Sequence, residues 1–195
     1  TQRMSLATAS FITRKISADR QYYTSTVVRR ALDAGLKVSS SYHDLDKSIP
    51  LPITFIKEVS QSLGSEGGLH MEIISLNPIN PRNGPKDAFQ NSALQRFAKG
   101  EDTRHYSFES FNGKQSVRYM IPDVATSQTC VDCHNSHPAS PKRDYKIGDV
   151  AGGLEVIIPI ESEMAAAMTD IWRSIVYGFV IILAMGLVGL AFIRR

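Results

Sequence analysis

An uncharged apolar run near the C-terminal end is the feature that most constrains how this chain can fold. Residues 174–193 contain no Asp, Glu, Lys or Arg and consist mainly of Ile, Val, Leu, Ala and Gly. A helix of about 20 such residues is long enough to cross the hydrocarbon core of a bilayer. We therefore expect one C-terminal transmembrane helix over 174–193, an exit helix over 161–173 that leads into it, and a globular domain before them.

The charges that flank this run predict its orientation. Arg194 and Arg195 follow the run and Arg173 precedes it, and basic residues favour the cytoplasmic side of a membrane. We therefore expect a single pass through the cell membrane, with the preceding domain on the periplasmic, extracytoplasmic side. The chain begins with Thr1 rather than Met, which is compatible with a processed chain or a fragment whose export signal or first helix preceded residue 1.

The net charge limits the partners that we expect, and the cysteine content limits the role of disulfides. The formal net charge of +3 is spread over the 195 residues without a concentrated basic stripe, so we expect no nucleic-acid partner. The chain has two cysteines, three positions apart. A disulfide framework needs more cysteines at wider spacing, and a chemical role for this pair is therefore expected.

Periodic patterns predict an α+β domain with a small antiparallel sheet. Apolar residues at three- and four-residue steps predict a long N-terminal helix within 1–40. Alternating residues on either side of Asn112-Gly113 predict a β-hairpin. Further helices are expected over 53–63 and 86–99, and further strands over 69–76 and 150–160, with Gly152-Gly153 at a bulge or close approach. A polar loop is expected over 125–146, within a domain that spans 41–160.

Cys130, Cys133 and His134 form a C-x-x-C-H motif. Two thiols at this spacing can bond to the two vinyl groups of one haem, and the adjacent imidazole can then coordinate the iron. The motif therefore predicts one covalently bound haem c, with thioethers at Cys130 and Cys133 and with His134 as the proximal ligand.

Three alternatives compete with haem attachment. A zinc site could use these three residues together with His137, although four ligands within eight residues strain a tetrahedron. A redox dithiol normally begins a helix in a βαβ context, which the pattern lacks. The spacing could also arise by chance. We favour His137 as a solvated loop residue.

A distal ligand must come from another segment. His43 is our first candidate, because it lies between the long helix and the rigid segment Ile49-Pro50-Leu51-Pro52. The other candidates are His70, Met71, His105, Met120 and the more remote Met4. Haem propionates would need a cation: Arg118 is the candidate, whereas Arg82, Lys142 and Arg143 are better explained as surface residues.

An ordered set of segments between about residues 20 and 160 resembles the periplasmic haem-c sensor domains with a PAS-like fold, which occur on bacterial chemoreceptors, kinases and cyclases and as stand-alone haem proteins. The matching segments are Tyr22-Tyr23-Thr24 with Val27-Val28, Tyr42-His43-Asp44, Ile49-Pro50-Leu51-Pro52 with Thr54-Phe55, Ser75 with Asn77-Pro78 and Asn80, Asn112-Gly113, Arg118-Tyr119, Cys130 to Asn135, and Gly148-Asp149-Val150 with Gly152.

The resemblance implies a PAS-like domain after a long N-terminal helix, with the haem against the sheet. It also implies that the N-terminal region, sometimes that of a partner subunit, can supply the distal ligand, which supports His43. A cysteine ligand is excluded, since both cysteines belong to the motif. The family's sensors continue into a cytoplasmic output domain, whereas this chain stops at Arg195.

We therefore expect a membrane-anchored mono-haem c-type cytochrome that transfers single electrons outside the cytoplasm and is not an enzyme. The expected partners are the lipid bilayer, a redox partner protein, and other membrane subunits or a second copy of the chain. The alternative is a haem-based redox or gas sensor whose output domain is absent from this chain.

Overall fold

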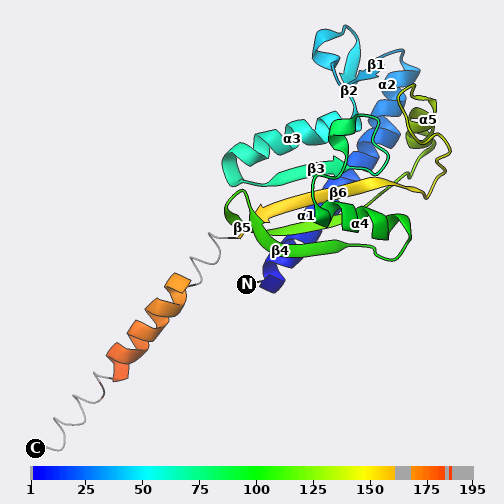
Figure 1. Cartoon of the computed structure of the whole chain (residues 1–195). Helices are drawn as coiled ribbons and strands as arrows, with labels where there is room; N and C mark the ends of the chain where they lie inside the picture. The colour runs from blue at the N-terminus through cyan, green and yellow to red at the C-terminus, as the bar shows by residue number, and fades with distance from the viewer. Residues whose placement is uncertain (1, 161–167, 183–184, 186–195) are drawn as a thin grey trace, which may run out of the picture.

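The computed structural model describes residues 2–160, 168–182 and 185, and its centre is a four-stranded antiparallel sheet (Figure 1). The strand order is β3 (His70–Ile74), β6 (Val150–Pro159), β5 (Lys114–Val124) and β4 (His105–Phe111). A small parallel sheet pairs β1 (Lys37–Ser39) with β2 (Ser48–Pro50). The antiparallel sheet and the long N-terminal helix agree with the sequence predictions.

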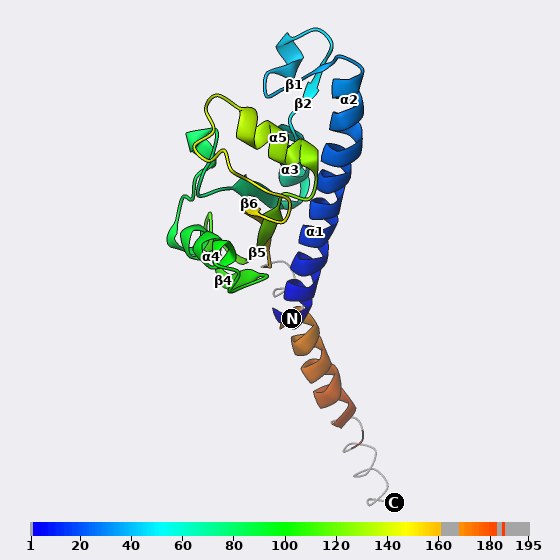
Figure 2. The same cartoon turned by 90° about the vertical axis from the view of Figure 1, so that its right-hand side faces the viewer.

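Helices cover both faces of the four-stranded sheet, as Figure 2 shows. The long helix α1 (Gln2–Tyr22) and helix α3 (Pro52–Gly67) pack on one face. Helix α4 (Ala88–Ala98) packs on the opposite face. Two short 3-10 helices lie in connecting segments: η2 (Tyr42–Asp44) between β1 and β2, and η3 (Pro81–Asn83) between β3 and α4. Helix α5 (Gln128–Ser136) lies between β5 and β6 in the chain.

The N-terminal helix is continuous in direction but changes its winding. The π-helical segment η1 (Tyr23–Val28) follows α1, and α2 (Arg29–Asp33) follows η1. The helix ends where Gly35 adopts a positive φ of 77°. The amide of Leu36 donates to the carbonyl of Ala31 and the amide of Gly35 donates to that of Leu32, both at 2.9 Å. This pair of bonds satisfies the last carbonyls of the helix and ends it at a glycine.

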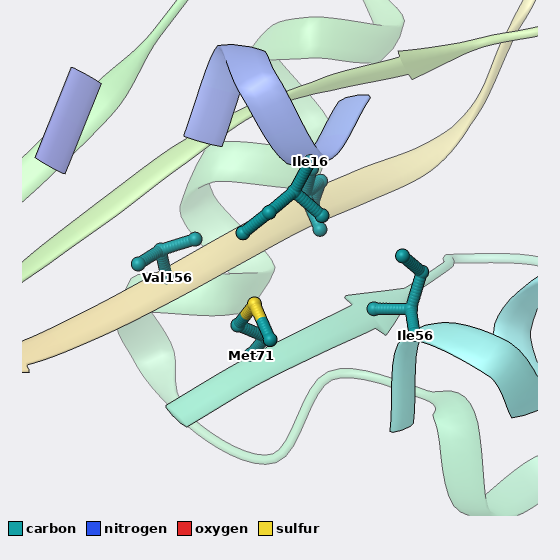
Figure 3. Packing of buried hydrophobic residues seen from close by; sticks show 5 residues of the cluster. Ile16, Ile56, Met71 and Val156 are labelled. Atoms are coloured by element: carbon teal, nitrogen blue, oxygen red, sulfur yellow. The ribbon is translucent and has the colours of Figure 1, made fainter. Parts of the chain in front are cut away.

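The main apolar core lies between the sheet and the two helices α1 and α3. Ile16 from α1 and Ile56 from α3 meet Met71 and Val156 from the sheet (Figure 3). Each such side chain, when fully buried, contributes roughly 1.5–3 kcal/mol from removal of apolar surface from water. A second cluster under α4 contains Ala93, Leu94 and Phe97 with Ile74 and Met120.

Two glycine-containing positions explain how the sheet is shaped. Asn112 and Gly113 have φ angles of 50° and 79° between β4 and β5, as a tight hairpin turn with two left-handed residues requires. Gly152 sits where β6 passes β3, and a Cβ added there would lie 2.3 Å from the carbonyl oxygen of Ile74. The predicted hairpin and the predicted close approach are thus both present.

The predicted transmembrane helix is not supported. Residues 168–182 and 185 are helical, but no helix within the part of the chain that the structure describes has the length and apolar character needed to cross a bilayer. The described stretch falls short of the required length of about 20 residues, and it includes the charged pair Asp170 and Arg173. The rest of the predicted exit helix and span, at 161–167, 183–184 and 186–193, lies outside the described residues. The C-terminal anchor, and the membrane location inferred from it, are therefore corrected.

Candidate functional site

The C-x-x-C-H motif lies on helix α5 and not in the polar loop that its composition predicts. Ser127 caps this helix in extended conformation, and its side chain accepts a hydrogen bond from the amide of Cys130 at 3.4 Å. A helix brings residues three and four positions apart onto one face. Cys130, Cys133 and His134 therefore share a face of α5.

Both thiols of the motif are free in the structure. The Sγ of Cys130 lies 3.2 Å from the hydroxyl oxygen of Ser127. Desolvation, followed by the neighbouring Cys130 thiol, raises the pKa of Cys133 above that of an ordinary thiol. The raised pKa keeps the Cys133 side chain in its thiol form at neutral pH.

The imidazole of His134 is half-buried and is held in its neutral form. Burial, followed by the charges of Arg20 and His137, lowers the pKa of His134. Its Nδ1 is buried and has no hydrogen-bond partner in the structure. A neutral imidazole keeps a lone pair available for a metal ion, and this state is what an axial ligand requires.

A reciprocal pair of hydrogen bonds positions Tyr145 beside this imidazole. The side-chain amide of Asn135 donates to the carbonyl oxygen of Tyr145, and its oxygen accepts from the amide of Tyr145, both at 3.0 Å. The ring of Tyr145 meets the His134 ring edge-on, with centroids 5.4 Å apart and planes at 77°. Asn135 therefore fixes the end of α5 against the following loop at the position of the histidine.

A small pocket opens beside the motif. Its walls come from α1, from the end of β5, from α5 and from the start of β6, through the residues Arg20, Asp123, Val124, Ala125, Cys130, His134, Tyr145 and Ala151. The guanidinium of Arg20 donates to the carboxylate of Asp123, and both residues are only 8% exposed. Burial raises the pKa of Asp123, although Arg20 acts in the opposite direction.

His43, the first candidate for the distal ligand, lies on the 3-10 turn η2. Its side chain is 72% exposed, and its Nε2 is 3.5 Å from a carboxylate oxygen of Glu58. It is not among the residues that line the pocket beside His134. Its role as distal ligand stays a prediction.

The other distal candidates also lie away from the pocket walls. Met71 and Met120 are buried in the two core clusters. His105 packs on the ring of Phe89, with centroids 4.9 Å apart. Met4 is exposed near the start of α1.

His70 belongs to a separate charged cluster at the start of β3. Its Nε2 lies 2.7 Å from a carboxylate oxygen of Glu72, which also accepts a hydrogen bond from Lys86 at 2.6 Å. Burial opposes ionisation of Glu72, but the contacts with His70 and Lys86 outweigh it and lower the pKa of Glu72 to about 2. The structure thus pairs His70 with a carboxylate.

Arg118, the candidate for propionate binding, is bound to carboxylates of the protein. Its guanidinium forms ion pairs with Asp87 and Glu109 at 2.7 Å and with Glu155 at 2.6 Å. It also lies over the ring of Phe89, 4.3 Å from the centroid. Arg118 is 4% exposed and does not line the pocket beside the motif.

Sequence reasoning missed three residues of this site: Arg20, Asp123 and Tyr145. For Arg20 a signal existed, because it is the one charged residue among the buried positions of α1, which are Ser5, Ala9, Thr13, Ile16 and Arg20. Asp123 and Tyr145 carry no comparable pattern, since only tertiary contacts bring them to the motif.

The fold and the site together define a small mixed α/β domain with a thiol–imidazole motif on one helix face. The model of the Tll0287-like family (Tll0287) matches residues 1–159. This chain therefore belongs to the Tll0287-like family, which confirms the resemblance to PAS-like haem-c domains inferred from the sequence.

One solved structure shows a similar chain. It is the crystal structure of the cyanobacterial heme-protein Tll0287, with a TM-score of 0.45 and 18% sequence identity, covering 56% of this chain and 72% of that chain. No curated protein matches this chain.

Proposed function

We propose that this domain is a mono-haem c-type cytochrome that carries single electrons, with thioethers at Cys130 and Cys133 and with His134 as the proximal ligand. The observation that carries the proposal is the motif on one face of α5, together with an imidazole held neutral beside a pocket. When bound, the haem supplies the one-electron change between ferric and ferrous iron.

The thiol groups fit covalent attachment. Each cysteine S–H adds across one vinyl C=C bond: an S–C bond forms, and the hydrogen passes to the other vinyl carbon, so no oxidant is consumed. Both thiols are free, and Cys133 is exposed. Covalent attachment requires only that they reach the edge of the ring.

The donor geometry also suits haem better than a metal held by side chains alone. Within residues 2–160, 168–182 and 185, no three His, Cys, Asp or Glu side chains are placed to hold a metal ion together. Haem needs only one metal ligand from this segment, because one imidazole coordinates the iron and the thiols bond to the porphyrin. Family membership supports the proposal, since a similar solved chain is a heme-protein.

The proposal is tested on the purified full chain by a reduced-minus-oxidised spectrum and a pyridine haemochrome assay. We expect pigment that survives acid–acetone extraction in the unaltered protein and in His137→Ala. We expect its loss in the double variant Cys130→Ala, Cys133→Ala. Extraction of all pigment from the unaltered protein, or a polypeptide mass without added tetrapyrrole, would contradict the proposal.

The second candidate function is haem-based sensing, and the π-helical segment η1 favours it. η1 (Tyr23–Val28) packs against α5, and π-helical turns occur frequently at functional sites. A bound gas or a change of iron oxidation state could bias the long helix through this contact.

Carbon monoxide addition and stopped-flow mixing with a redox partner protein distinguish the two functions. An electron carrier should exchange electrons with a redox partner rapidly and should leave its reduced spectrum unchanged by carbon monoxide. Fast gas binding, without electron exchange, would favour sensing.

A further inference from the structure

The row of buried residues on α1 ends at a charged residue, Arg20, which lies beside the C-x-x-C-H motif. Arg20 occupies a position that an apolar residue would ordinarily fill, and its guanidinium donates to the carboxylate of Asp123. Removing two charges from water is costly, and apolar replacements of such pairs are often as stable or more stable. Stability alone is therefore a weak reason for this pair.

The structure holds both charges at the walls of the pocket that contains Cys130 and His134. The Nε of Arg20 is buried and has no hydrogen-bond partner. The pairing of β5 with β6 is irregular between Asp123 and Val124, and such bulges turn a side chain away from the regular sheet direction. Both side chains are only 10% exposed, so each charge is largely shielded from water.

We propose that the charges of Arg20 and Asp123 set the reduction potential of the haem that His134 would coordinate. This inference rests on the proposed function. A buried cation stabilises ferrous haem, because reduction removes one unit of positive charge, and a buried anion stabilises ferric haem by the same argument. The two side chains therefore act with opposite sign on one equilibrium.

The test is a potentiometric titration of the full chain with its covalently attached haem. Loss of Arg20 favours protonation of the buried Asp123 carboxyl, so the titration is carried out at alkaline pH, where Asp123 stays ionised. Under that condition Arg20→Gln should lower the midpoint potential, and Asp123→Asn should raise it. Each variant should change the ratio of reduced to oxidised haem at a fixed potential about tenfold, which is about 59 mV for one electron. The double variant should return close to the unaltered protein, because it removes both charges.

A matched control lies on the same helix. Lys15 forms an exposed ion pair with Asp19 at 2.6 Å, and Lys15→Gln should leave the midpoint unchanged because water screens its charge. Arg20→Lys keeps the positive charge and should keep the midpoint close to that of the unaltered protein. If Arg20→Gln does not fold, Asp123→Asn carries the test, because it must raise the midpoint while Arg20→Lys leaves it close to that of the unaltered protein.

Two results would overturn the inference. If Arg20→Gln and Asp123→Asn both shift the midpoint in the same direction, the pair acts on solvent access or packing and not through its charges. If neither single variant moves the midpoint, the charges have no influence on the iron. Absence of covalent haem from the unaltered protein is a different outcome, and it overturns the proposed function together with this inference.

Discussion

Replacing Arg118 with methionine should destabilise the domain strongly, because it leaves Glu155 buried without a counter-ion. Glu155 has no exposed surface and Arg118 is 4% exposed. Breaking a buried ion pair by removing one partner costs about 3–5 kcal/mol. The other two partners, Asp87 and Glu109, keep side chains that are 39% and 40% exposed, so their pairs add less than about 1 kcal/mol each.

The lower end of that range is expected, because Glu155 has two ways to reduce the cost. The side-chain amide of Gln90 still donates to it at 2.7 Å. Burial already raises the pKa of Glu155, and loss of Arg118 raises it further, so the carboxyl can take up a proton. We expect a loss of about 3 kcal/mol at pH 7, which lowers Tm by roughly 6–12 °C for a domain of this size.

Thermal unfolding followed by circular dichroism measures this loss. The double variant Arg118→Met, Glu155→Gln should recover most of it, because the isolated charge is gone. Arg96→Met is the matched control: Arg96 pairs with Asp102 at the surface, and its loss should leave Tm nearly unchanged because water screens the pair.

The pH dependence supplies a second check on the Arg118 argument. A raised folded-state pKa means that the folded variant binds more protons than the unfolded chain as the pH falls. The difference in the free energy of unfolding between Arg118→Met and the unaltered protein should therefore become smaller as the pH falls through the raised pKa of Glu155. A Tm within 2 °C of the unaltered protein at pH 7 (about 1 kcal/mol or less), or a double variant less stable than Arg118→Met, would refute the reasoning.

Three further predictions concern other parts of the domain. The pKa of Glu72 is lowered from 4.5 to about 2 in the folded domain, which adds roughly 3 kcal/mol to the free energy of unfolding above pH 4.5. This contribution is lost as the pH falls from 4.5 towards 2. Glu72→Gln should therefore flatten the acid-unfolding curve over that window, and an unchanged acid transition would contradict the prediction. Gly152→Ala should destabilise by more than about 2 kcal/mol in urea unfolding, because its Cβ meets the carbonyl of Ile74; Gly178→Ala, with open space around it, should be neutral, and equal effects would refute the steric argument. Asn135→Ala should cost about 1–2 kcal/mol through its two lost hydrogen bonds and should accelerate amide hydrogen exchange in α5; unchanged exchange would show that the contact does not anchor the helix.

Local patterns predicted much of the fold from the sequence. Asn112-Gly113 sets the hairpin because both residues adopt positive φ, and Gly35 ends the N-terminal helix for a related reason. The alternating residues on either side of that turn form the predicted pair of antiparallel strands, β4 and β5. Such features depend on a few neighbouring residues, and a sequence displays them directly.

The local motif gave Cys130, Cys133 and His134, but the rest of the pocket depends on tertiary contacts that no local pattern displays. Arg20 and Asp123 are 103 positions apart, and their pairing exists only once α1 lies against the end of β5. Helix α5 lacks an apolar stripe, which is why its segment was predicted as a loop. Hydropathy likewise suggested a membrane span over 174–193, whereas the described helix is too short for that purpose.

Helix α5 is attached to the rest of the domain by very little. It buries only Val131, and a nine-residue helix is marginal on its own. Ser127 holds its first turn and Asn135 holds its last. The residues of α5 between these two attachments can therefore change while the sheet stays intact. The exposed residues Asp132 and Ser136 are therefore where substitutions could accumulate and retune the chemistry without loss of the one buried contact at Val131.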